Sequence, residues 1–158
     1  MKSGRGKYIA AAAVIAALYT ALTLVLSPIS YNVMQLRFSE GMSVLALYTP
    51  AAVPGLFVGC FMANILGPGG ITDALFGSIA TLIGCLGIRA LKKEPWLALC
   101  TVVISNAVIV GLELRYVFSL EMSPAVCMMW IALGEAVSVY LPAVLLKPWL
   151  DRHHGKLF

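Results

Sequence analysis

The sequence predicts an all-α integral membrane protein, a six-transmembrane-helix bundle with both termini in the cytoplasm. Of its 158 residues, 61% are hydrophobic and only 11% are charged, and the mean hydropathy is +0.94. Soluble domains have about 45–50% apolar and about 25% charged residues, so this composition cannot cover a water-facing surface. Long apolar runs alternate with short clusters of proline, glycine and charge, and they leave no length for a soluble domain.

The apolar runs divide one integral membrane domain, residues 1–158, into spans. They lie near residues 8–26, 37–49, 51–66, 71–91, 96–113 and 125–147. The second and third are short, because a helix needs about 20 residues to cross about 30 Å of hydrocarbon. Alternatively, residues 37–66 form one long helix kinked at Pro50 and Pro54, which gives five spans.

The distribution of Lys and Arg favours six spans over five, because cytoplasmic loops carry the excess of these residues. With six spans, nine of the 11 lie on the side of the termini, and Arg37 and Arg115 lie on the other side. With five spans the split is four to seven, against the rule. Six spans are therefore predicted, and neighbouring helices must cover the ends of the two short ones.

Small residues repeat every four positions in the first and third spans, which lets helix backbones approach closely in lipid. The columns are Ala12, Ala16 and Thr20; Ala13, Ala17 and Ala21; and Ala51, Gly55, Gly59 and Ala63. We expect the third-span column to serve internal packing. The first span carries two columns, more than one neighbour needs. Its column at Ala13, Ala17 and Ala21 is therefore predicted either to pack internally or to dock another membrane protein.

Polar side chains also fall within or near the outer halves of the predicted spans. Glu135 lies near the middle of the last span, where an ionisable group is costly unless it is paired or hydrated. Hydrogen-bonding groups and an aromatic wall are what a small-molecule pocket requires. The candidate binding residues in this pattern are Arg37, Glu40, Asn64, Asp73, Asn106, Trp130 and Glu135.

Some of these candidates have a structural alternative. Glu40 follows Arg37 by three residues, so the two can form an ion pair along a helix. Asp73 can cap the helix that begins near residue 71. Asn64 precedes a turn at residues 67–70 and can mark the end of a helix.

The sequence has no pattern for catalysis, metal binding or cofactor binding. It contains no phosphate-binding loop, no HExxH and no nucleophile motif, and its four cysteines form no CxxC pair. We therefore predict no enzyme, no cofactor and no metal site. The net charge of +4 follows from membrane topology and does not indicate a nucleic acid partner.

One stretch of the chain, about residues 36–82, carries a family motif. The motif comprises Arg37-Phe-Ser-Glu40, Thr49-Pro50, Gly55, Gly59-Cys60, Ala63-Asn64, Asp73, Gly77-Ser78 and Ala80-Thr81. It resembles the QueT family of predicted queuosine-precursor transporters, which are substrate-binding S-components of energy-coupling factor (ECF) importers. Span count and topology are similar over the whole chain.

The resemblance implies that the protein captures queuine or another deazaguanine precursor at the outer face of a bacterial plasma membrane. It also implies that Ala13, Ala17 and Ala21 dock a transmembrane coupling subunit, which is powered by two separate cytoplasmic ATPases. A deazaguanine edge suits the candidates, because a carboxylate accepts from its ring N–H and amino group while an amide donates to its carbonyl. For this implied substrate, the candidates to cover the ring face are Trp130, Phe76 and Tyr116. An S-component for another vitamin-like substrate, an autonomous small-solute carrier and a membrane scaffold protein are the alternatives.

Overall fold

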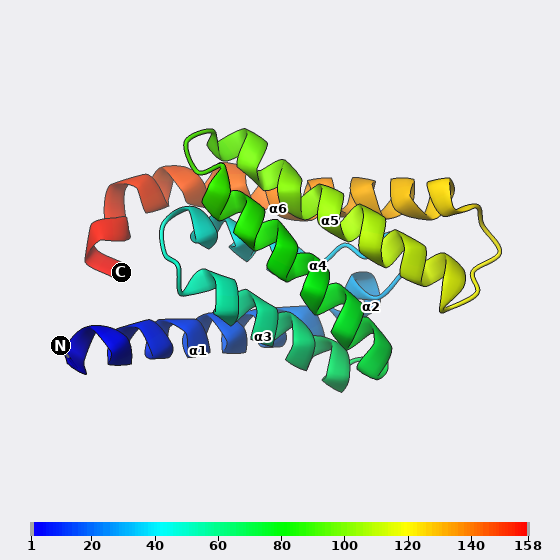
Figure 1. Cartoon of the computed structure of the whole chain (residues 1–158), viewed down its shortest axis with the longest axis horizontal. Helices are drawn as coiled ribbons and strands as arrows, with labels where there is room; N and C mark the ends of the chain where they lie inside the picture. The colour runs from blue at the N-terminus through cyan, green and yellow to red at the C-terminus, as the bar shows by residue number, and fades with distance from the viewer. Residues whose placement is uncertain (1, 158) are drawn as a thin grey trace.

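The computed structural model describes residues 2–157, which form a bundle of helices (Figure 1). The elements are α1 (Lys2–Val25), α2 (Ser27–Ser30), the 3₁₀ helix η1 (Phe38–Leu47), α3 (Ala52–Leu66), α4 (Gly70–Ala90), α5 (Pro95–Tyr116) and α6 (Pro124–Leu157). This part of the chain contains no β-strand, which confirms the predicted all-α class.

Proline and glycine set most of the helix ends. Both α5 and α6 begin with a proline, which lacks the N–H that the first turn of a helix leaves unpaired. α4 begins at Gly70, whose φ of +69° favours glycine. The predicted ends of these helices are therefore close to the observed ones. By contrast, α6 continues ten residues beyond the predicted end at residue 147, and an ion pair between Lys147 and Asp151 spans the added turn at 2.8 Å.

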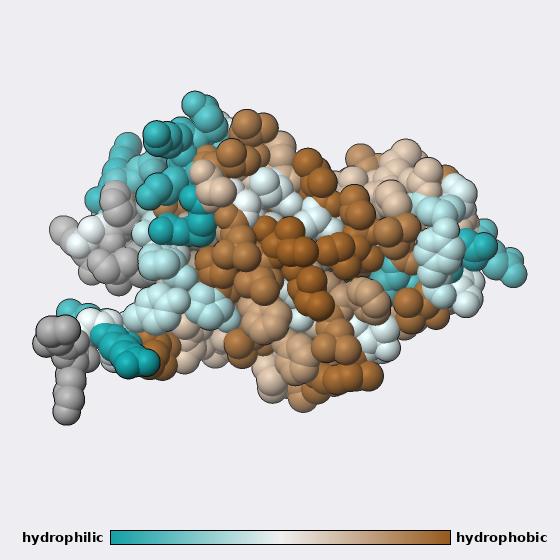
Figure 2. Space-filling view, viewed as in Figure 1, coloured by the Kyte–Doolittle hydropathy of each residue, from teal (hydrophilic) through white to brown (hydrophobic). Residues whose placement is uncertain are grey.

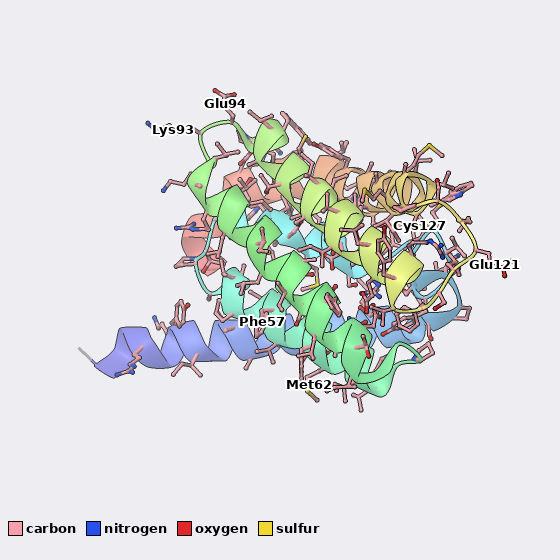
Figure 3. The ribbon with its side chains drawn as sticks, turned by 45° about the vertical axis from the view of Figure 1, so that its right-hand side comes forward. Phe57, Met62, Lys93, Glu94, Glu121 and Cys127 are labelled. Atoms are coloured by element: carbon pink, nitrogen blue, oxygen red, sulfur yellow. The ribbon has the colours of Figure 1, made fainter. Side chains whose placement is uncertain are left out.

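Successive long elements run back and forth along the bundle (Figure 1). α1 leads away from the end that holds the N-terminus, and the segment through η1 returns to it. α3 then leads away, α4 returns, α5 leads away again and α6 returns to the starting end. Both termini and the turn between α4 and α5, which bears Lys93 and Glu94 (Figure 3), therefore lie at the same end. We call the other end the distal end.

The surface of the bundle suits a lipid environment. Figure 2 shows hydrophobic residues over the middle of one face and hydrophilic residues toward its two ends. In the described chain, four helical stretches are long and apolar enough to span a membrane: Gly4–Val25, Gly70–Ala90, Pro95–Tyr116 and Pro124–His153. η1 and α3 are apolar but shorter.

The second predicted span, residues 37–49, differs from an ordinary transmembrane helix. Its helical part is η1, a ten-residue 3₁₀ helix, which at about 2.0 Å per residue covers about 20 Å. η1 lies inside the bundle and contacts α1, α3, α4, α5 and α6. Its Gly41 permits a close approach to α6, because an added Cβ would lie 2.5 Å from the ring of Pro142. Neighbouring helices therefore cover this short segment, as the sequence predicted.

The contact between α1 and α3 uses the small residues that the sequence singled out. An added Cβ on Gly55 would lie 2.8 Å from the carbonyl oxygen of Ala12, and one on Gly59 would lie 2.9 Å from that of Ala16. The hydroxyl group of Thr20 donates to the carbonyl oxygen of Gly59 at 3.0 Å. The internal-packing role of the third-span column is confirmed.

Candidate functional site

Polar and charged side chains are concentrated inside the bundle around η1. The four buried carboxyl residues that the structure describes are Glu40, Asp73, Glu113 and Glu135, and each is at most 2% exposed. Arg37 is buried among them. Burial of so many ionisable groups in a membrane protein is costly unless they are paired, so this cluster marks the candidate site.

The 3₁₀ conformation aligns the polar residues of η1. Side chains three positions apart eclipse one another in a 3₁₀ helix, whereas an α-helix spreads them around its axis. Arg37, at the start of η1, is therefore followed on the same line by Glu40 and Ser43. All three side chains are buried. The conformation of η1 thus presents one polar line to the surrounding helices.

Arg37 is held by α4 and by the segment that precedes η1. Its Nη2 lies 2.9 Å from Oδ2 of Asp73, and its Nε donates to the carbonyl oxygen of Ser30 at 3.2 Å. The guanidinium also lies 5.1 Å from the centre of the Tyr31 ring, within the range of a cation–π contact. The alternative of an ion pair between Arg37 and Glu40 is therefore wrong. An Asp73 cap is also wrong, because the N-cap of α4 is Gly69 with no side-chain hydrogen bond in the described chain.

Tyr31 also braces this segment against α3. Its hydroxyl group donates to the carbonyl oxygen of Ala63 at 2.6 Å. Burial raises the pKa of Tyr31 to about 12, although the nearby charge of Arg37 acts in the opposite direction. The hydroxyl group therefore keeps its proton and its donor role at physiological pH.

Glu40 is held by hydroxyl groups from two other helices. Tyr19 of α1 and Thr81 of α4 both donate to its Oε1. Its Oε2 is buried and has no hydrogen-bond partner among residues 2–157. Glu135 of α6 lies near enough for the charges of Glu40 and Arg37 to act on it, and its own Oε2 is likewise unpartnered in the described chain. Two carboxyl groups from different elements therefore offer free acceptors at the centre of the bundle.

Asn64 connects α3 to α4 beside the Arg37–Asp73 pair. Its Nδ2 donates to the backbone oxygen of Asp73 at 2.9 Å, while its Oδ1 is buried and unpartnered within the part of the chain described. An added Cβ on Gly77 would lie 2.8 Å from this Nδ2. Gly77 therefore leaves the space that Asn64 occupies. Asn64 bridges two helices and does not simply mark a helix end.

A pocket of about 250 Å³ is lined by residues from segments that meet at the distal end of the bundle (Figure 1). Its walls come from the segment before η1, the α3–α4 turn, α4, the end of α5 and the following loop. The lining residues are Tyr31, Asn32, Val33, Gln35, Pro68, Gly69, Asp73, Leu114, Phe118 and Leu120. Ligand pockets of drug size are about 300–1,000 Å³, so this pocket suits a small ligand.

Gln35 in the pocket wall was not among the predicted site residues. It is buried, and its φ of 46° lies in the left-handed region, which is unfavourable for a side chain of this size. Asn32 stabilises this turn, because its Oδ1 accepts from the backbone N–H of Gln35 at 2.8 Å. Left-handed residues of this kind concentrate at binding and active sites. No sequence pattern predicts the left-handed backbone conformation of Gln35.

Glu113 of α5 was also missed as a site residue, although a spacing pointed to it. It follows Asn106 by seven residues, two turns of an α-helix, so the two share a face. Both are buried. Asn106 donates to the carbonyl oxygen of Val102 at 3.2 Å, whereas both Glu113 oxygens are unpartnered in the structure as described. Glu113 directly precedes Leu114, which lines the pocket, so it belongs to the pocket end of the cluster.

The structure thus brings Arg37, Glu40, Asn64, Asp73, Asn106 and Glu135 into the interior of the bundle. The three aromatic candidates are less buried than these polar residues. Trp130 is half-buried on α6, and Phe76 and Tyr116 are exposed, Tyr116 to 67%. Tyr31 and Phe118, which line the pocket, supply aromatic surface at the distal end instead.

The first helix keeps one of its small-residue columns on the surface. Ala13, Ala17 and Ala21 are exposed, whereas Ala12 and Ala16 face α3. The exposed column therefore forms a flat strip along α1. Its docking role stays a prediction.

Comparisons with known proteins agree with this description. The sequence model of a family described as QueT transporter matches residues 9–152. The queuosine precursor transporter QueT of Lactococcus lactis subsp. cremoris (strain MG1363) is 33% identical to this chain over 85 residues, which are 52% of this chain. The matched segment spans 50%, about half, of the length of that relative. No solved structure matches the chain significantly.

Proposed function

The chain belongs to the QueT transporter family, and from this premise we propose that it is the substrate-binding subunit of an ATP-driven ECF importer. Its substrate would be queuine or a deazaguanine precursor of queuosine, captured at the outer face of the bacterial cell membrane. The name of the Lactococcus relative, a queuosine precursor transporter, supports this substrate class.

The observation that carries the proposal is a buried polar cluster beneath a small pocket at the distal end. Glu40, Asn64 and Glu135 each hold a buried acceptor oxygen that lacks a partner in the described chain. Asp73 belongs to the cluster and also lines the pocket. A ligand with several N–H groups can satisfy such oxygens, and a ligand without them leaves them unpaired.

A deazaguanine base matches this set of groups. Its ring N–H and amino group form an adjacent pair of donors, which one carboxylate can accept in parallel. Glu135 or Glu40 would take that role, and Asn106 or Asn64 would donate to the ring carbonyl. Buried groups arranged for this edge would reject bases that lack it, because the polar groups would then stay unpaired.

We propose a topology of six crossings with both termini in the cytoplasm. The two termini and the turn between α4 and α5 lie at one end of the bundle (Figure 1). That turn contains Lys92 and Lys93 in the sequence, which supports this orientation by the positive-inside rule. The distal pocket would then face outward, as a capture site requires.

Transport energy would come from partner chains. The exposed strip of Ala13, Ala17 and Ala21 offers a flat surface on which a helix of the transmembrane coupling subunit can pack closely. Two cytoplasmic ATPases bound to that subunit would hydrolyse ATP. The subunit described here would hold the substrate and would not itself be an enzyme.

Ligand titration tests the proposal. The purified full-length chain is titrated with queuine, its cyano and aminomethyl precursors, guanine, riboflavin and thiamine, and tryptophan fluorescence reports binding. We expect saturable quenching by the deazaguanines alone. Saturation by riboflavin or thiamine instead would indicate another vitamin-like substrate, and no response to any compound would contradict a binding role.

A substitution and an uptake assay complete the test. Glu135→Gln is expected to weaken binding by about 1–3 kcal/mol, because it removes one carboxyl oxygen that can accept from the ligand. Glu94→Gln is the control, since Glu94 is exposed at the end near the termini (Figure 3). Uptake into proteoliposomes is expected only with the coupling subunit and ATPases present. Uptake by the chain alone would favour an autonomous carrier.

A further inference from the structure

The buried ionisable groups include more acids than bases. Among the side chains that the structure describes, four buried carboxyl groups surround one buried cation, Arg37. Arg37 is already paired with Asp73 and bonded to the backbone of Ser30. Uncompensated carboxylates in a low-dielectric interior are costly, and a cation that enters the site relieves that cost.

The unpaired acidic groups lie at the pocket end of the cluster. Asp73 lines the pocket, and while its Oδ2 is bonded to Arg37, its Oδ1 has no partner within residues 2–157. Glu113 has two such oxygens, and the charge of Asp73 acts on it. Leu114, the next residue after Glu113, also lines the pocket. Asp73, in the pocket wall, and Glu113, next in sequence to a wall residue, together hold three unpartnered oxygens in the described chain.

Three acceptors beside a pocket match one chemical group closely. A protonated primary amine has three N–H donors, no acceptor and a positive charge. A nitrile is neutral and has only an acceptor, so it would face carboxylate oxygens without a hydrogen bond. The two deazaguanine precursors differ in this respect, because one bears an aminomethyl arm and the other a cyano group.

Resting on the proposed function, we infer that Asp73 and Glu113 form an ammonium subsite that binds the protonated amine of the substrate arm. The site therefore selects aminomethyl-substituted deazaguanine over the cyano-substituted compound. The deeper carboxyl groups Glu40 and Glu135 remain for the edge of the base. The charge of Arg37 acts on both Glu113 and Glu135.

A ligand series on the unmodified full-length chain gives the first test. Affinities are measured by titration calorimetry for the aminomethyl compound, its N-acetylated form, which is neutral, and the cyano compound. Charge-assisted hydrogen bonds are about twice as strong as neutral ones, so we expect the aminomethyl compound to bind at least about tenfold more tightly than either neutral compound. Equal affinity for all three would overturn the ammonium subsite.

Substitution of Glu113 gives the second test. Glu113→Gln is expected to lower the affinity for the aminomethyl compound at least about tenfold. Its affinity for the cyano compound should stay within about twofold of that of the unmodified chain. Glu121→Gln is the matched control, because Glu121 is an exposed carboxylate in the loop after α5 (Figure 3) and should change neither affinity. An equal loss for both ligands in Glu113→Gln would overturn the inference.

The two proposals fail in different ways. If no deazaguanine binds the unmodified chain, the proposed function fails. If the deazaguanines bind but charge on the arm has no effect, only the ammonium subsite fails. The ligand series needs no variant, so it decides the question even if Glu113→Gln does not fold.

Discussion

Loss of the Arg37 guanidinium should destabilise the protein far more than loss of the Lys147 ammonium group, which forms an ion pair of nearly the same length but is more exposed. The Arg37–Asp73 and Lys147–Asp151 pairs have N–O distances of 2.9 and 2.8 Å. The side chains of the first pair are both 3% exposed, whereas those of the second are 19% and 49% exposed. Distance is therefore matched between the pairs, and burial is what differs.

Arg37→Met keeps most of the apolar stem and leaves the Asp73 carboxylate buried without its cation. Removal of one partner from a buried pair costs about 3–5 kcal/mol. A chain of this length loses about 2–4 °C in thermal midpoint per kcal/mol, so the expected fall is about 6–20 °C. Lys147→Met disrupts an exposed pair and should cost less than about 1 kcal/mol.

Thermal unfolding of the purified full-length chain in detergent measures both variants. Addition of Asp73→Asn to Arg37→Met removes the orphaned charge, so the double variant should lose less stability than the two single variants added together, by about 0.5–3 kcal/mol. Strict additivity, or a fall for Arg37→Met no larger than that for Lys147→Met, would refute the reasoning that burial makes this pair essential.

Three further predictions follow from single contacts. Gly59→Ala should destabilise the chain by about 1–3 kcal/mol in the same unfolding assay, because the new Cβ would lie 2.8 Å from that of Tyr19, whereas Gly6→Ala, with nothing within 4 Å, should not. Gln35→Asn should retain the thermal midpoint, since Asn tolerates the left-handed region, yet weaken deazaguanine binding in titration by about 1 kcal/mol through its shorter amide. Ala17→Leu should preserve ligand affinity but prevent co-purification with the coupling subunit. Normal co-purification would show that α1 does not form the docking surface.

Much of the fold could be predicted because the signals are local. Pro95 and the turn at residues 67–70 mark helix ends directly, and the glycine column with Gly55 and Gly59 identified an internal contact. The 3₁₀ form of η1 was not predicted. Its ten residues are too few for periodicity to separate helix types, although polar residues at Arg37, Glu40 and Ser43 repeat every three positions.

The site was harder to predict because its contacts are not local. Sequence spacing suggested Glu40 as the partner of Arg37, but folding brings Asp73, 36 positions away, against the guanidinium. Glu113 escaped selection because a glutamate near a helix end is normally solvated. In the structure α5 packs against α4, α6 and η1, and Glu113 is buried.

The short length of η1 and the polarity of the site have the same origin. A helix that faces lipid must cross the whole hydrocarbon region and cannot expose charged groups to it. Because five other helices contact η1, this segment is free of both requirements. It can be about 20 Å long and still carry Arg37 and Glu40, whose partners come from α1 and α4. An apolar α-helix in its place would be stable in the membrane but would present no hydrogen-bonding groups to a polar substrate.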